Sequence, residues 1–197
     1  MVTPGTYTLK LTADGKMMTT TVAVQPDPRL QLSPEEQAQQ LKMALAIRDD
    51  LNRLAKMVNQ IRALRKQLQA RNELLQDQEK TKPLVQSSND MMKKLDVLEE
   101  KLHNPKAQVT YDILAQPGGA KLYSQLSPLF DYAKEGDGPP TQGMRDVYAE
   151  YTRDLNVYAK EFGALLTGEL AELNQMAKKL EIPTVFVSEK QQGTKSP

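Results

Sequence analysis

The chain of 197 residues contains no cysteine, no tryptophan and a single histidine. Without cysteine, a disulfide scaffold, a cysteine-bound metal and a cysteine nucleophile are excluded. No apolar run comes near the ~18 residues that a membrane-spanning helix requires, so the sequence predicts no membrane insertion. No basic segment leads into an apolar one after Met1, and no signal peptide is therefore predicted in this chain. A charge excess is also lacking, because 26 Lys and Arg stand against 25 Asp and Glu, which argues against a general polyanion binder.

The single histidine limits the catalytic and metal sites that the chain can build. A di-metal carboxylate bundle needs two Glu-x-x-His motifs, and the sequence offers only Glu100 to His103. We interpret His103 as the end of a helix, where an imidazolium is electrostatically favoured. The acidic pairs Asp49-Asp50 and Glu99-Glu100 are neighbours on predicted helices and point different ways, whereas glycoside hydrolysis needs two acids that converge. We therefore expect no catalytic residue, no metal or cofactor site, and a chain that is not itself an enzyme.

The first residues predict a β-hairpin. Apolar and polar residues alternate over residues 6–13, which is the period of a half-buried strand. Asp14-Gly15 follows and favours a type I′ turn, because both central residues of that turn need positive φ. With these two as the loop, the residue numbers of every cross-strand pair sum to 29. One face of the ribbon then carries Tyr7, Leu9, Leu11, Met18 and Val22. Because an isolated hairpin is marginal in water, we expect it to pack on the helices or to close a sheet that lies outside this chain.

A long helix is predicted over residues 34–79. Ser33 is a good N-cap, Pro34 suits the first helical position and Glu36 completes a capping box. No glycine or proline follows before Pro83. Apolar residues recur mostly at steps of three or four, which places them on one face of the helix. This stripe consists of Leu41, Ala44, Ile47, Leu51, Leu54, Val58, Ile61, Leu64, Leu68 and Leu75.

Three further helices are predicted, over residues 87–103, 119–134 and 141–180. Proline and glycine separate them: Pro83 ends or kinks the first helix, and residues 136–140 form a loop. The fold class that follows is mainly α, a long-helix up-and-down bundle of about four helices preceded by an N-terminal β-hairpin.

The chain divides into a hairpin (residues 1–29), a helical bundle (30–187) and a polar tail (188–197). Within the bundle, residues 109–111 and 182–187 lack helical periodicity and favour short extended segments.

The first predicted helix carries a basic block with no acid between Leu51 and Asn72. This candidate interaction patch consists of Arg53, Lys56, Arg62, Arg65, Lys66 and Arg71. It is interpreted as a face that is solvated or paired within the chain, or as a site for a protein partner. The block has no aromatic residue for base stacking, so we expect no nucleic-acid partner. Acidic residues along the last predicted helix favour pairing within the chain, with the first and last helices antiparallel.

Several stretches in their order carry a resemblance to a known family. They are PGTYTLKLTADGK (residues 4–16), VAVQPDPR (22–29) before a long helix, DGPPT (137–141), and LAELN (170–174) ahead of Ile-Pro at 182. The chain resembles the C-terminal part of large bacterial exported proteins with BNR-repeat, sortilin-like β-propellers, often labelled glycosyl-hydrolase-like. The resemblance implies that residues 1–29 are the closing strands of an Ig-like or fibronectin-like domain. It also implies export to the periplasm or beyond, and the propeller and Ig-like domain of the parent chain as partners. No catalytic residue is carried over.

The leading hypothesis is a non-catalytic structural or interaction module at the C-terminus of a larger exported propeller protein. An alternative from another class is a self-contained coiled-coil adaptor that dimerises through the stripe of the first helix. A weaker alternative is a fragment of a hydrolase that acts on glycans. Beyond the parent chain, another protein or a second copy of this chain stays open as a partner.

Overall fold

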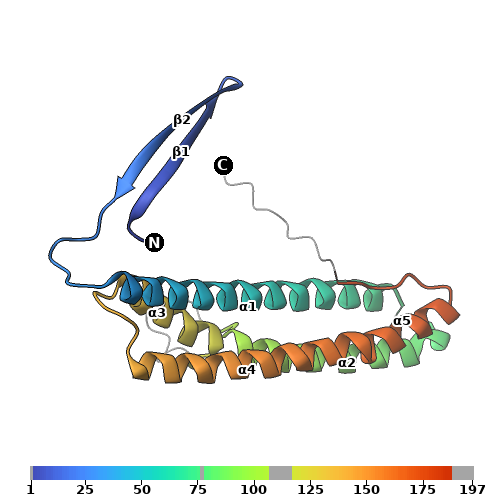
Figure 1. The fold of residues 1–197 in the computed structure, drawn as a ribbon. Coiled ribbons are helices and arrows are strands. Elements are labelled where there is room, and N and C mark those ends of the chain that lie inside the picture. Colours follow the sequence, from blue (N-terminus) through green and yellow to red (C-terminus); the bar gives the residue numbers. More distant parts are fainter. Residues whose placement is uncertain (1, 76–77, 107–116, 188–197) are drawn as a thin grey trace.

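In the computed structural model, which describes residues 2–75, 78–106 and 117–187, a β-ribbon projects from one end of a rod of helices (Figure 1). The ribbon consists of β1 (Gly5–Ala13) and β2 (Lys16–Val24). The rod consists of α1 (Pro34–Leu75), the short 3₁₀ helix η1 (Glu79–Thr81), α2 (Lys82–Leu102), α3 (Leu122–Glu135), α4 (Gln142–Thr167) and α5 (Glu169–Lys179). The predicted class, a mainly α bundle behind an N-terminal hairpin, is confirmed.

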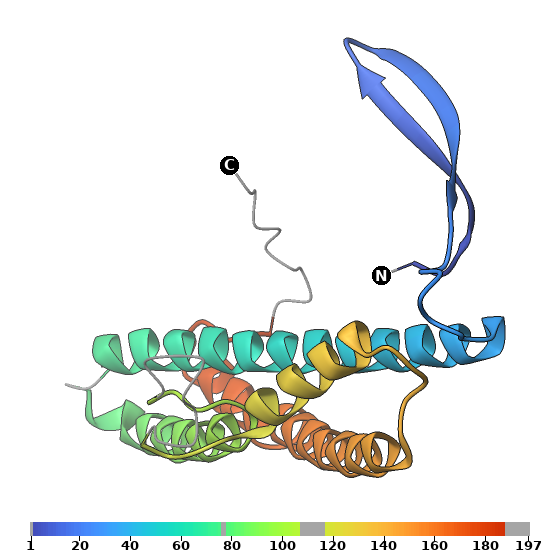
Figure 2. The ribbon, with the colours of Figure 1, turned by 90° about the vertical axis from the view of Figure 1, so that its left-hand side faces the viewer.

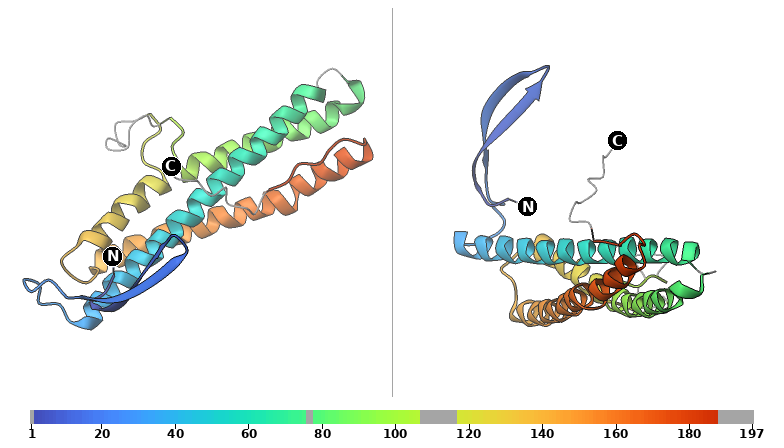
Figure 3. Two further views of the ribbon diagram at one scale, coloured as in Figure 1. Left: turned by 90° about the horizontal axis from the view of Figure 1, so that it is seen from above. Right: turned by 90° about the vertical axis from the view of Figure 1, so that its right-hand side faces the viewer.

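The helices form three legs of the rod: α1 is the first, α2 with α3 the second, and α4 with α5 the third. Figure 2 shows α2 and α3 following one another along α1. Seen from above in Figure 3, the legs lie side by side, with α1 crossing over the other two. At ~1.5 Å per residue, the 42 residues of α1 span about 63 Å. One unbroken helix therefore supports two legs that are each made of two helices.

The direction of each leg follows from its side-chain contacts. Between α1 and α4, Gln39 pairs with Arg145 and Arg53 with Asn156, so the residue numbers rise together and the helices are parallel. The predicted antiparallel pairing of the first and last helices is therefore wrong. The cause is that α2 and α3 together make a single return leg, which brings α4 back to the end where α1 begins (Figure 1).

Local signals place the start of α1 and the turn of the ribbon. The Ser33 hydroxyl accepts from the Glu36 N–H (3.2 Å) and the Glu36 carboxylate from the Ser33 N–H (2.8 Å), which is the predicted capping box. Asp14 and Gly15 have φ of 48° and 71°, as a type I′ turn requires. The register is the predicted one. Leu11 lies opposite Met18, and the residue numbers of all nine pairs sum to 29.

Helix boundaries differ from the predictions at four places, one of which is the start of α3 at Leu122 rather than at residue 119. The first helix ends at Leu75 rather than at residue 79. The second begins at Lys82, five residues early, because Pro83 stands in its first turn, where its missing N–H is not needed. The last predicted helix is divided at Gly168, whose backbone is not helical (φ −95°, ψ −90°), into α4 and α5. The predicted extended segment at residues 109–111 and the polar tail lie outside the described residues.

The core runs along the rod where the three legs face one another. Eight of the ten residues in the predicted stripe of α1 are buried, and Leu41 and Leu51 are half-buried. The other legs contribute leucines of α2, α3 and α5, together with Leu155 and Phe162 of α4. No helix among the described residues combines the length and the apolar content needed to cross a bilayer.

After α5 the chain reverses and residues 182–187 run back along the C-terminal half of α1 (Figure 1). The reversal is a Schellman turn: the Ile182 N–H donates to the Ala177 carbonyl (2.9 Å) and the Glu181 N–H to the Lys178 carbonyl (3.2 Å). Glu181 takes the left-handed position with φ 58°, where glycine is usual. Val185 is buried in the core that this segment closes.

Candidate interaction surface

The basic block of α1 does not form one surface, because its members point to different neighbours. Helical spacing distributes residues 53–71 around the helix, so some face α2, some face α4 and some face solvent.

Arg62 and Arg65 reach across to α2 and hold Glu99. Arg62 Nε donates to Glu99 Oε1 (2.6 Å) and Arg65 Nη1 donates to Glu99 Oε2 (3.2 Å), while Arg65 also pairs with Asp96. The Glu99 side chain is only 4% exposed, whereas both arginines are partly in solvent. The buried carboxylate thus has its charge compensated by two cations that keep contact with water. The acid that compensates this part of the block comes from α2 and not, as expected, from α4.

Arg53 belongs to a second cluster, between α1 and α4. It donates to Asn156 (2.7 Å) and lies 4.0 Å from the carboxylate of Asp50 on its own helix. The same carboxylate accepts from the Tyr148 hydroxyl (2.9 Å) and from the Thr152 hydroxyl (3.0 Å). Burial, together with the neighbouring negative charge, raises the pKa of Tyr148 to about 12. Tyr148 therefore stays neutral and links α4 to Asp50 of α1 through its hydrogen bond. A neutral tyrosine hydroxyl cannot serve as a general base at neutral pH.

Arg71 is buried between α1 and α2, where its Nη2 donates to the Ser88 hydroxyl (2.9 Å). Burial lowers the pKa of Arg71. Next to it, the Asn72 amide donates to Asn89 (3.0 Å), so a polar layer crosses the α1–α2 contact at this level. With 7% of its surface exposed, Arg71 contributes nothing to an outer patch.

Lys56 and Lys66 are the members of the block that remain exposed without an ion pair among the described residues. Of the six predicted patch residues, the structure therefore brings Arg62 and Arg65 together and separates the rest. Pairing within the chain, one of the open interpretations, accounts for most of the block.

The ribbon is the second candidate surface. It stands clear of the rod (Figures 1 and 2), and its apolar face is open: Leu9, Leu11 and Met18 are 53%, 58% and 62% exposed. β1 and β2 pair only with one another in the part of the chain that the structure describes, so the outer edge of each strand is unpaired. Of the two expected arrangements, packing on the helices is not found, and the apolar face of the ribbon lacks a partner within the described chain.

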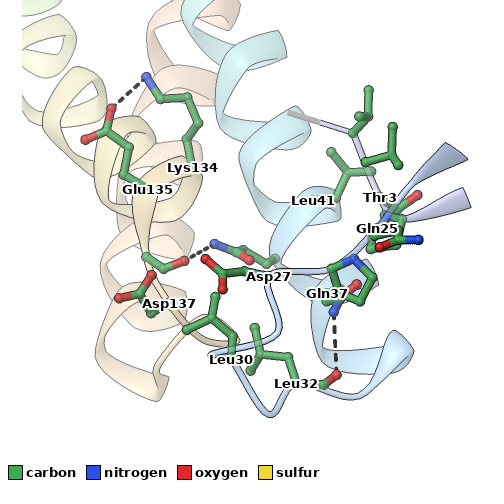
Figure 4. A pocket seen from close by; sticks show the side chains of 16 residues that line it. Thr3, Gln25, Asp27, Leu30, Leu32, Gln37, Leu41, Lys134, Glu135 and Asp137 are labelled. Carbon is green, nitrogen blue, oxygen red and sulfur yellow. Dashed lines mark hydrogen bonds and ion pairs between the residues drawn. The ribbon is translucent and has the colours of Figure 1, made fainter. Parts of the chain in front are cut away.

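A crevice of about 330 Å³ lies where the ribbon joins the rod (Figure 4). Leu30, Leu32 and Leu41 line its apolar side, and Asp27 and Asp137 its polar side. One wall is fixed by the side chain of Gln40, whose amide donates to the carbonyl of Gly136 (2.5 Å). Asp27 is already paired with Arg29 (2.6 Å), and the crevice serves as the seat of the linker between ribbon and rod.

The residues considered for catalysis are dispersed. Glu99 is buried and Glu100 exposed, as their adjacent positions on one helix predict. His103 does end α2, as predicted. Burial and the nearby Arg62 nevertheless lower the pKa of His103, which favours the neutral ring. Among the described residues, no group of His, Asp and Glu side chains is arranged to hold a metal ion.

No protein-family model matches the chain, and no curated protein and no solved structure matches it. The resemblance to propeller proteins therefore rests on the residues quoted for it alone.

Proposed function

We propose that this chain is a structural and interaction module without catalytic activity of its own, at the C-terminus of a larger exported propeller protein. In this proposal the helical rod is the scaffold, and the ribbon supplies the closing strands of an Ig-like or fibronectin-like sheet in the parent chain.

The observation that carries the proposal is the open apolar face of the ribbon. Leu9, Leu11 and Met18 lie on one face and are each more than half exposed. Full burial of such a side chain contributes ~1.5–3 kcal/mol, and a two-stranded ribbon is marginal in water without it. The opposite face is more polar: it carries five threonines and Lys10 beside Met17 and Ala23. A ribbon with one apolar face and two unpaired edges is suited to join a sheet and to pack on a second one.

Two further observations favour this module over its alternatives. The coiled-coil adaptor needs the apolar stripe of α1 at its surface, and that stripe packs within the chain against the other legs. A glycan hydrolase needs two acids that converge on the substrate. In each of the pairs Asp49-Asp50 and Glu99-Glu100, one side chain is more buried than the other, so the two point in different directions.

The sequence encoded in frame before Met1 provides a first test. We expect it to encode a propeller followed by an Ig-like or fibronectin-like domain. A gene that starts at Met1 would contradict the proposal.

The second test measures hydrogen exchange at the backbone amides of β1 and β2, with and without the encoded upstream domain co-expressed. We expect the upstream domain to slow exchange in the ribbon. Leu9→Lys should abolish this protection, whereas Thr8→Lys, on the opposite face of the same strand, should preserve it. Exchange that is indifferent to the upstream domain, or equal effects of the two lysines, would count against a sheet-forming ribbon.

A further inference from the structure

The C-terminal segment of residues 182–187 is held by side-chain amides in a way that recognises peptide backbone. The Asn174 amide of α5 donates to the Val185 carbonyl (2.8 Å) and accepts from the Val185 N–H (3.0 Å). The Gln67 amide of α1 does the same for Phe186, donating to its carbonyl (2.8 Å) and accepting from its N–H (3.1 Å). Each amide thus satisfies both backbone groups of one residue, as a neighbouring β-strand would.

The side chains of the segment add an anchor to this backbone recognition. Val185 is 5% exposed and belongs to the core, and Ile182 and Val187 pack partly against it. Phe186, between the two, is 66% exposed. The groove between α1 and α5 is therefore a site for an extended peptide with a branched aliphatic residue at the Val185 position and no selection at the next.

The turn that delivers the segment into the groove is strained. Glu181 takes φ 58°, a conformation that disfavours residues with a Cβ atom and that glycine would take freely. If the turn opens, the strain is relieved and the segment leaves its own groove. Short strained hinges of this kind favour the exchange of an identical element between two copies.

We infer that the groove between α1 and α5 is a peptide-binding site whose partner in trans is residues 182–187 of a second copy of this chain. The two copies exchange their segments reciprocally, and each Val185 occupies the groove of the other copy. The closed monomer and the exchanged dimer have the same contacts in the groove and differ in the turn at Glu181. This site is independent of the ribbon, so its failure and that of the proposed function are distinguishable.

The decisive variant is Glu181→Pro in the full-length chain. Proline cannot adopt positive φ, so the closed turn is removed while the groove and the segment keep their contacts. We expect light scattering to show a dimer for this variant at about 100 μM, because a high protomer concentration favours association. Glu181→Gly, which relieves the strain without opening the turn, should lower the dimer fraction below that of the unchanged protein.

Second substitutions show whether the dimer uses the groove. Adding Val185→Asp to Glu181→Pro should restore the monomer, whereas adding Thr184→Asp at the neighbouring exposed position should leave the dimer intact. A Glu181→Pro variant that is monomeric, or a dimer that survives Val185→Asp, overturns the inference.

A direct titration keeps the inference testable if Glu181→Pro does not fold. The Val185→Asp chain, whose own segment is displaced, is titrated with a labelled synthetic peptide of residues 181–187. We expect saturable binding that weakens about tenfold or more when Asn174→Ala removes both of its hydrogen bonds. Lack of binding to the Val185→Asp chain, or equal binding with and without Asn174→Ala, contradicts a peptide site between α1 and α5.

Discussion

Replacing Leu54 by aspartate tests whether the stripe of α1 is the part of the rod on which stability depends. Leu54 is 1% exposed and lies in the middle of α1, the helix that contacts both other legs. Losing its burial removes ~1.5–3 kcal/mol. An unpartnered carboxylate among apolar side chains adds several kcal/mol more. The total loss is at least ~4 kcal/mol, a large part of the free energy of unfolding of a typical protein, which is about 5–15 kcal/mol.

Urea unfolding followed by far-ultraviolet circular dichroism measures this loss. The matched control is Leu74→Asp, on the same helix, because Leu74 is 81% exposed. The control should change the free energy of unfolding by no more than ~0.5 kcal/mol. The Leu54 variant should also regain part of its stability as pH falls from 7 toward about 4, because protonation removes the buried charge.

Two results would refute this reasoning. An unchanged urea midpoint for Leu54→Asp would mean that the stripe does not face the core. An equal decrease in the free energy of unfolding for Leu54→Asp and Leu74→Asp would mean that the effect comes from aspartate in the helix and not from burial at Leu54.

Three more outcomes are expected. Glu99→Gln, which removes the buried charge shared by two arginines, should lower the free energy of urea unfolding by ~1–3 kcal/mol, while Glu100→Gln at the exposed neighbour should have almost no effect. The pKa of Tyr148 is raised to about 12 in the folded state. The stability that this shift contributes is therefore complete below the ordinary pKa of tyrosine and is lost as pH rises toward 12. The free energy of unfolding, measured at successive alkaline pH values, should depend less on pH in Tyr148→Phe than in the unchanged protein. Gly118→Ala should lower the melting temperature, because φ is +94° and the new Cβ would lie 3.1 Å from a buried amide, whereas Gly163→Ala, with nothing within 4 Å, should raise stability by ~0.5–1 kcal/mol.

The features that sequence reasoning found are those that short stretches determine by themselves. The Asp14-Gly15 turn fixes the register of the ribbon, and the Ser33 and Glu36 side chains fix the start of α1. The period of the apolar residues then identifies the buried face of α1, including Leu54. Each of these signals acts over a few residues, so the remainder of the fold does not alter it.

The direction of α4 depends on distant contacts, and the charge pattern was a poor guide to it. An exposed ion pair contributes only ~0–1 kcal/mol, too little to choose between parallel and antiparallel legs. The core decides, through the end-to-end arrangement of α2 and α3. The division at Gly168 was likewise hidden, because a glycine in a helix costs only ~1 kcal/mol and is often tolerated.

The amides that hold the C-terminal segment could not be identified from the sequence. Gln67 lies on a long helix and Asn174 on a short one. Asn174 ends the LAELN stretch, but nothing in that stretch indicates that its amide binds backbone. The sequence indicated only that residues 182–187, an apolar stretch without helical periodicity, form a short extended segment. Their role becomes visible only when the reversal at Glu181 places the two amides on either side of one backbone.

The break at Gly168 gives the rod a hierarchy of stability. α5 has only 11 residues and is joined to α4 through a non-helical residue, whereas α1 is uninterrupted over 42. Short units that are connected by a break open on their own before the molecule unfolds as a whole. A protease should therefore cut near Gly168 while α1 stays protected, and the end of the rod that carries α5 is the end at which the native state first loosens.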